Sequence, residues 1–230
     1  MRTDVANATG AAGGGVGGRP AGRPRQITRE RIVSAARELP PEALTMQAVA
    51  AALGVDPKAL NYHIGDRQRL RELVALDVFE SELRRVMLPA DGDWRVVARS
   101  YAAAIRDAFV ELGVLATWFH LPAASGLGAL APVECLLQAL VDAGFDVDHA
   151  GRALTLITET AYAAGRAAVL VDQRSVHPNV PEVASALATA AATDFPVLRE
   201  VASSRQDGGD AGQFEFSLTA VIAGLEHMLG

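Results

Sequence analysis

The stretch LTMQAVAAALGVDPKALNYHIGDRQRL, residues 44–70, decides the fold of the front part of this chain. It predicts two short helices that meet at a turn around Gly54, a residue type suited to the left-handed position after a helix. Asp56 followed by Pro57 is a typical helix start, because aspartate caps the backbone and proline is favoured in the first turn. Helices this short are marginally stable alone in water, so neighbouring segments must pack against them.

Helices on both sides of this stretch supply that support. Residues 27–40 carry apolar side chains at helical spacing, with Thr28 as the expected N-cap, and Thr45 caps the next helix. Asp66 is the expected N-cap of a long helix over residues 67–87. The small core predicted for these segments consists of Ile32, Ala36, Leu39, Val49, Leu53, Leu60 and Leu70.

The rest of the chain also has helical periodicity, and no strand or repeat pattern is visible. Polar segments rich in Gly, Pro and Asn predict loops at residues 172–181 and 203–212, with only a turn or two at residues 195–201. The predicted fold class is therefore all-α, with a small front bundle and a larger rear bundle. The rear helices are expected at residues 94–111, 114–120, 133–143, 148–171, 181–192 and 213–229.

The net charge of −6 is unevenly distributed along the 230 residues. Residues 19–85 hold more Lys and Arg than Asp and Glu, whereas residues 86–230 hold fewer. Such asymmetry can mark nucleic-acid contact at one end of a chain. The single cysteine, Cys135, cannot form an intrachain disulfide, and its apolar neighbours predict a buried structural thiol.

Several classes of protein are disfavoured by what the sequence lacks. It has no signal-peptide core and no apolar run long enough for a membrane helix, which predicts a soluble cytoplasmic protein with no membrane partner. It also has no GxSxG, HExxH or Walker A motif and no Cys/His cluster. We therefore expect no enzymatic activity, no cofactor and no metal site.

Two short helices joined by a Gly-containing turn match the helix-turn-helix arrangement of DNA-binding proteins. On the exposed face of the second helix, Lys58 could meet guanine or phosphate, Ala59 a thymine methyl group, and Asn61 an adenine edge. An ordinary helical hairpin with a solvated polar face is the alternative interpretation. Further contacts with phosphates or bases are expected from Thr45, Gln47, Tyr62, His63 and Arg67.

Residues 1–26 are rich in Gly and Ala and predict a disordered arm. Within it, the stretch GGRPAGRPR interleaves arginines, including Arg25, with Gly and Pro. Arginines on an extended arm can enter the minor groove of DNA. A solvated tail without DNA contacts is the alternative.

The stretch LTMQAVAAALGVDPKALNYHIGDRQRLRELV resembles the DNA-binding domain of the tetracycline-repressor (TetR) family in the order and spacing of its residues. The segments DWRVVARSYAAAIRDAFVELG, VECLLQALVDAGF and FEFSLTAVIAGLEHMLG resemble the C-terminal domain of the tetracycline repressors themselves. The resemblance covers about residues 27–229 and is more specific at the front.

The resemblance implies a homodimeric transcriptional regulator, expected to act as a repressor, that binds a palindromic DNA operator and is released by a small molecule. It implies a helix-turn-helix domain at residues 27–72 and a ligand-binding and dimerisation domain at residues 73–230, after the arm. The helices at residues 148–171 and 213–229 would form a four-helix bundle with those of the second subunit. A stripe of small and apolar residues along the first of them, Leu154, Ile157, Ala161, Gly165 and Ala168, would allow close approach of another helix.

Bulky and polar residues expected on the inner faces of the Ala-rich rear bundle are the candidates for effector binding. His120 falls where tetracycline repressors place a histidine that binds the magnesium of the drug, but Leu83 and Tyr101 replace two expected polar groups. A largely apolar effector is therefore favoured over tetracycline–magnesium, and control by a protein partner without an effector is a further alternative. Plain core packing remains open for each candidate: Phe79, Leu83, Tyr101, Ile105, Phe109, Trp118, His120, Leu136, Tyr162 and Arg166.

Overall fold

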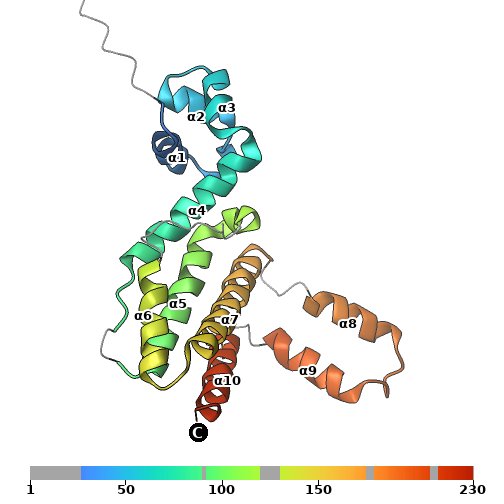
Figure 1. Ribbon diagram of the computed structural model, residues 1–230. Coiled ribbons are helices and arrows are strands. Elements are labelled where there is room, and N and C mark those ends of the chain that lie inside the picture. Colours follow the sequence, from blue (N-terminus) through green and yellow to red (C-terminus); the bar gives the residue numbers. More distant parts are fainter. Residues whose placement is uncertain (1–26, 90–91, 120–129, 175–178, 208–211, 230) are drawn as a thin grey trace, which may run out of the picture.

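A computed structural model describes residues 27–89, 92–119, 130–174, 179–207 and 212–229 of the chain. Within these ranges the chain forms helices and no strand, as the sequence predicts. In Figure 1 a small front bundle, here called the head, stands at one end of α4, and the other helices form a larger body at the opposite end. The elements are α1 (Arg29–Arg37), η1 (Pro41–Ala43), α2 (Met46–Leu53), α3 (Pro57–Ile64), α4 (Arg67–Arg85), α5 (Trp94–Leu112), η2 (Gly113–Trp118), α6 (Leu130–Asp142), α7 (Val147–Arg174), α8 (Asn179–Thr189), α9 (Pro196–Asp207) and α10 (Gln213–His227).

The helix starts in the head follow the capping residues of the sequence. Thr28 accepts a hydrogen bond from the backbone N–H of Arg31 at 3.3 Å, and Thr45 accepts one from Ala48 at 3.1 Å. Asp56 and Asp66 accept in the same way at the starts of α3 and α4. Gly54 ends α2 with φ of 67°, the left-handed conformation that glycine adopts without steric cost. These predictions of helix boundaries are confirmed.

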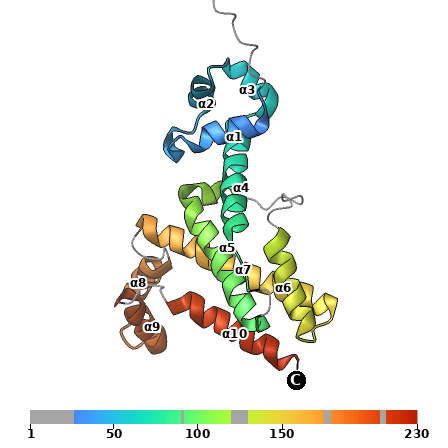
Figure 2. The same cartoon turned by 90° about the vertical axis from the view of Figure 1, so that its left-hand side faces the viewer.

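The head has the predicted apolar core. Ile32, Ala36, Val49, Leu60 and Leu70 are buried, and Leu39 and Leu53 are half-buried and pack against them. The core does not stop at the head, because α4 continues from Leu70 into the body without a break. The expected boundary between residues 72 and 73 therefore falls inside a continuous helix (Figure 2).

The body is built around α5, which packs against α4, α6 and α7. Gly165 of α7 lies against Phe109 of α5 so closely that an added Cβ would be 2.5 Å from the Phe109 Cβ and 3.0 Å from the backbone oxygen of Arg106. Ile157 and Ala161, which belong to the same stripe, are also buried within this chain. At Gly165 the stripe packs against α5 of its own chain. The expectation that the stripe offers its surface to another subunit is therefore wrong at this residue.

The segment after Phe195 differs most from the sequence expectation. It forms α9, a helix of 12 residues, where only a turn or two was expected. The guanidinium group of Arg199 donates hydrogen bonds to the backbone oxygens of Leu187 and Ala191, at 2.8 and 2.9 Å, and so satisfies the end of α8. The resulting α8–α9 hairpin lies beside the body on the side of α7 and α10 (Figure 1).

Other helix limits shift by a few residues, as is usual for predicted ends. The loop expected at residues 172–181 is shorter, because α7 extends to Arg174 and α8 begins at Asn179. Cys135 is half-buried rather than fully buried. Across the parts of the chain that the structure describes, none of the helices is both long enough and apolar enough to cross a membrane.

Candidate DNA interface and effector site

The outward face of α3 carries the polar residues predicted to read DNA. Leu60 and Ile64 point into the core of the head, which leaves Lys58, Asn61 and His63 exposed. The Tyr62 side chain is 88% exposed, so it has no packing role in this chain beyond an edge-on contact with the His63 ring. Ala59 is half-buried. The arrangement presents a short row of hydrogen-bonding groups on a helix of the size that enters a major groove.

The side chains predicted to contact DNA near the start of α2 and the start of α4 differ in what they bind within the chain. Gln47 is exposed, whereas the Thr45 side chain is engaged in capping α2. Arg67 has a structural bond that the sequence did not reveal, since its Nε donates to the backbone oxygen of Leu44 at 3.0 Å. Arg67 therefore ties the first turn of α4 to the entry of α2. Arg25 lies outside the described residues.

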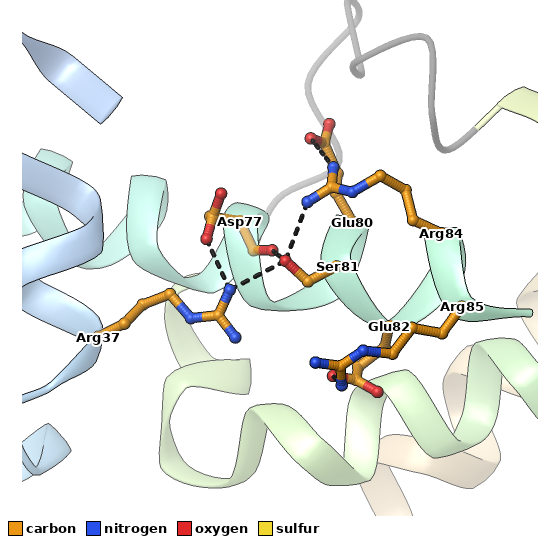
Figure 3. A network of polar contacts seen from close by, with 7 residues as sticks. All are labelled: Arg37, Asp77, Glu80, Ser81, Glu82, Arg84 and Arg85. Atoms are coloured by element: carbon orange, nitrogen blue, oxygen red, sulfur yellow. Dashed lines mark hydrogen bonds and ion pairs between the residues drawn. The ribbon is translucent and has the colours of Figure 1, made fainter. Parts of the chain in front are cut away.

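Ion pairs and hydrogen bonds also fix α1 to α4, as Figure 3 shows. The guanidinium group of Arg37 donates to the Asp77 carboxylate and to the Ser81 hydroxyl, both at 2.9 Å. Arg84 also donates to Ser81 at 2.9 Å. Together with Arg67, these contacts attach α4 to the head at two points along its length. A displacement of α4 must therefore displace the head.

Four aromatic rings meet where α4, α5, α7 and the end of η2 come together in the body. The Phe79 ring of α4 is 4.5 Å from the Phe119 ring and 5.6 Å from the Phe109 ring, measured between centroids. Phe109 is in turn 4.6 Å from Tyr162 of α7. Phe79, Phe109 and Tyr162 were candidates from the sequence, but Phe119 was not. We call Phe79, Phe109, Phe119 and Tyr162 the aromatic cluster.

Hydroxyl groups lie next to the aromatic cluster. The hydroxyl oxygens of Tyr101 and Thr158 are 3.2 Å apart, and Thr158 donates to the backbone oxygen of Leu154. Because burial disfavours the phenolate, the pKa of Tyr101 is raised above its usual value. Burial also raises the pKa of Tyr162, and the neighbouring Tyr101 adds to the shift. Both phenols are therefore neutral hydrogen-bonding groups at physiological pH.

The remaining effector candidates are placed differently from one another. Leu83, Ile105 and Leu136 are buried in the core, and Trp118 is half-buried. Arg166 is exposed, so its expected position on an inner face is wrong for this chain. His120 lies outside the described residues. Within those residues, no three His, Cys, Asp or Glu side chains gather as a metal site would require.

An all-helical head with a helix-turn-helix, joined by one long helix to a helical body, defines a class of DNA-binding regulator. Comparisons with known proteins narrow the class. Residues 88–229 match the family model described as "Tetracyclin repressor-like, C-terminal domain". The chain therefore belongs to the TetR family of transcriptional regulators.

Individual proteins are similar to this chain in sequence or in fold. The class C tetracycline repressor protein of Escherichia coli is 26% identical over 208 residues, which cover 88% of this chain and 92% of that protein. Among solved structures, apo ActR from Streptomyces coelicolor matches with a TM-score of 0.70 and 24% identity, covering 89% of this chain and 99% of that one. The Q116A variant of TetR from Acinetobacter baumannii in complex with minocycline matches with a TM-score of 0.61 and 20% identity, covering 89% of this chain and 99% of that one.

Proposed function

We propose that this TetR-family chain is a ligand-responsive transcriptional regulator that binds a palindromic operator as a homodimer and leaves it when a small, largely apolar effector binds. The observation that carries the proposal is the exposed row of Lys58, Asn61, Tyr62 and His63 on α3, on a head attached to the body through α4. We expect operator binding to repress transcription. We also expect a cytoplasmic location, because the protein must reach its operator.

The proposed DNA contacts divide by chemistry. Lys58 and Asn61 are the candidates for base edges, with Gln47 beside them, because their side chains can donate to or pair with groups in the major groove. Tyr62, His63 and Arg67 are the candidates for phosphates, which fix the position of the head without reading sequence. Ala59 and Thr45 are secondary candidates, since the first is half-buried and the second caps α2.

Dimerisation through α7 and α10 is supported by their outward faces. The two helices pack against each other, and both carry exposed apolar residues. Leu156 of α7 is 44% exposed and Phe216 of α10 is 71% exposed. Ala220 and Ala223 are exposed one and two turns after Phe216 and leave room for a second helix. Large exposed apolar side chains next to small ones favour association with another surface.

The aromatic cluster with the Tyr101 and Thr158 hydroxyls is the proposed effector site. Its aromatic surface favours an apolar ligand, and the neutral hydroxyl groups can orient one through hydrogen bonds. For the ligand to weaken operator affinity 100-fold, it must bind the released state more favourably than the DNA-binding state by about 2.7 kcal/mol. Of the other candidates, Leu83, Ile105 and Leu136 would line the apolar wall.

Titration of the purified protein with labelled duplex DNA at several salt concentrations tests the DNA-binding part of the proposal. Phosphate contacts predict a steep fall of affinity with salt, with a slope close to −0.9 per phosphate neutralised. Salt-independent or absent binding would refute it. Addition of apolar aromatic compounds to the complex then tests the effector part, because loss of the bound duplex supports a sensor and persistent binding favours control by a protein partner.

A further inference from the structure

Arg71 of α4 contacts Trp118 of η2 in the part of α4 nearest the head, where α4 packs against the body. The guanidinium carbon of Arg71 lies 4.3 Å from the centroid of the Trp118 ring, a cation–π arrangement. Trp118 is the last residue of η2, and the next residue, Phe119, belongs to the aromatic cluster. A shift of Phe119 is therefore transmitted to Trp118 through a single peptide bond.

Arg71 is also close to the head. It follows Arg67 by four residues, which is about one helical turn and places both side chains on the same face of α4. The positive charge of Arg67 adds to the effect of burial in lowering the pKa of Arg71, as expected for neighbouring guanidinium groups. Arg67 donates to the backbone oxygen of Leu44, just before α2, and so contacts the head. Arg71, one turn further along α4, contacts Trp118 of the body.

The Arg71 contact is incompletely satisfied. Its Nε atom is buried and has no hydrogen-bond partner, although buried donors in native proteins nearly always have one. The pKa of the guanidinium group is lowered mainly by burial, which reflects the same loss of hydration. Such a group has more to gain from a rearrangement than a fully bonded one, so this contact is suited to change between two positions of α4.

We propose that Arg71 is a positioning residue that couples η2 to the head, so that displacement of Trp118 shifts the first turns of α4 and, through Arg67, the entry of α2. The proposal deepens the proposed function and rests on it. It names a side chain that, in addition to Phe79 of α4, links the aromatic cluster to the exposed face of α3. By reciprocity, operator binding must then change the surroundings of Trp118.

Fluorine NMR of protein labelled with 5-fluorotryptophan tests this reciprocity without an effector. The chain has two tryptophans, Trp94 and Trp118, so two resonances are expected, and Trp118→Phe assigns them. The probe is an operator duplex recovered from a random DNA pool. We expect binding of the duplex to shift the Trp118 resonance. The resonance of Trp94, which is the first residue of α5 and packs against Phe145, should stay in place. An unchanged Trp118 resonance in the DNA-bound protein would overturn the proposal.

A double-mutant cycle on operator affinity gives a second, independent readout. Arg71→Met and Trp118→Leu should each change the dissociation constant by roughly 2- to 30-fold, and the double variant should resemble one single variant rather than their product. Arg71→Lys, which keeps the cation, should lie closer to the wild type than Arg71→Met.

The matched control is Arg85→Met, which removes the same charge from the other end of α4, where Arg85 is exposed and paired with Glu82. Additive effects of Arg71→Met and Trp118→Leu, or an affinity for Arg71→Met equal to that for Arg85→Met, would contradict the coupling. If the wild type binds no duplex from the random pool, the proposed function is refuted instead. That result precedes any comparison of the variants.

Discussion

At the scale of single residues, the side chains of α3 have the most specific proposed role. Asn61 is exposed and can form two hydrogen bonds with the edge of an adenine. We predict that Asn61→Ala lowers operator affinity by about 1–3 kcal/mol and relaxes base preference at one position of each half-site. Binding-site profiles of the variant and the wild type measure this.

The control for Asn61→Ala is Gln68→Ala. Gln68 is also exposed, but it lies on α4 and not on α3, and its side-chain amide donates to Glu72 of α4. We expect this control to leave the binding-site profile unchanged. If Asn61→Ala leaves the profile unchanged too, Asn61 does not read a base.

Gly165 tests the packing of α7 on α5 at the same scale. An added methyl group would meet the Phe109 Cβ at 2.5 Å and a backbone oxygen at 3.0 Å, and neither can move freely. We predict that Gly165→Ala destabilises the protein by about 1–3 kcal/mol, the usual cost of overpacking a core. Denaturant unfolding measures this difference.

Gly151 of the same helix is the matched control, because an added Cβ there meets no atom within 4 Å. Since alanine is a better helix former than glycine, Gly151→Ala should be neutral or stabilise the protein by up to about 1 kcal/mol. Equal destabilisation by both substitutions would mean that helix propensity and not the close contact decides the outcome.

At the scale of secondary-structure elements, local signals in the sequence predicted the head well and the body less well. Each N-cap side chain in the head accepts a hydrogen bond from a backbone N–H no more than three residues later, so its capping role follows from sequence alone. These N-caps are Thr28, Thr45, Asp56 and Asp66. The role of Phe119 depends on rings from three other helices that are distant in sequence. No local pattern reveals such a contact.

Two other errors have the same origin. The stripe on α7 was correctly predicted as a close-packing surface, but periodicity does not say which helix will cover it, and α5 of the same chain covers Gly165. The helix α9 was missed because a short polar segment has a weak pattern, while Arg199 stabilises it through backbone oxygens of α8. Arg67 and Leu44 are likewise 23 positions apart, so their bond was invisible in the sequence.

The α8–α9 hairpin gives a prediction at this scale. Arg199 donates to the oxygens of Leu187, Ala190, Ala191 and Asp194, and so connects the end of α8 to α9. We predict that Arg199→Met lowers hydrogen-exchange protection in both helices, because a guanidinium group that satisfies several carbonyls is lost. Protection in α5 and α7 should remain as in the wild type. Unchanged protection in α8 and α9 would show that Arg199 does not hold the hairpin together.

At the scale of the whole molecule, the proposed dimer depends on the outward faces of α7 and α10. Phe216 is the largest side chain exposed on α10, so a charge at this position should oppose association. We predict that Phe216→Glu shifts the protein from dimer to monomer in sedimentation experiments and weakens operator binding, because two heads on one dimer bind together.

Leu130→Glu is the control for this prediction. Leu130 is also an exposed apolar residue, but it is the first residue of α6, a helix outside the proposed α7–α10 contact between subunits. The variant should sediment as the wild type does. A Phe216→Glu protein that remains dimeric would locate the subunit contact elsewhere.

The central claim is that the head reads a palindromic DNA sequence as one half of a dimer. Selection of bound DNA from a random pool with the full-length protein, followed by sequencing, tests it most directly. The account predicts enrichment of a palindrome whose half-sites are centred about one helical turn of DNA or slightly more apart, roughly 10 base pairs or above. A pool without enrichment, or a single unpaired half-site, would contradict the account.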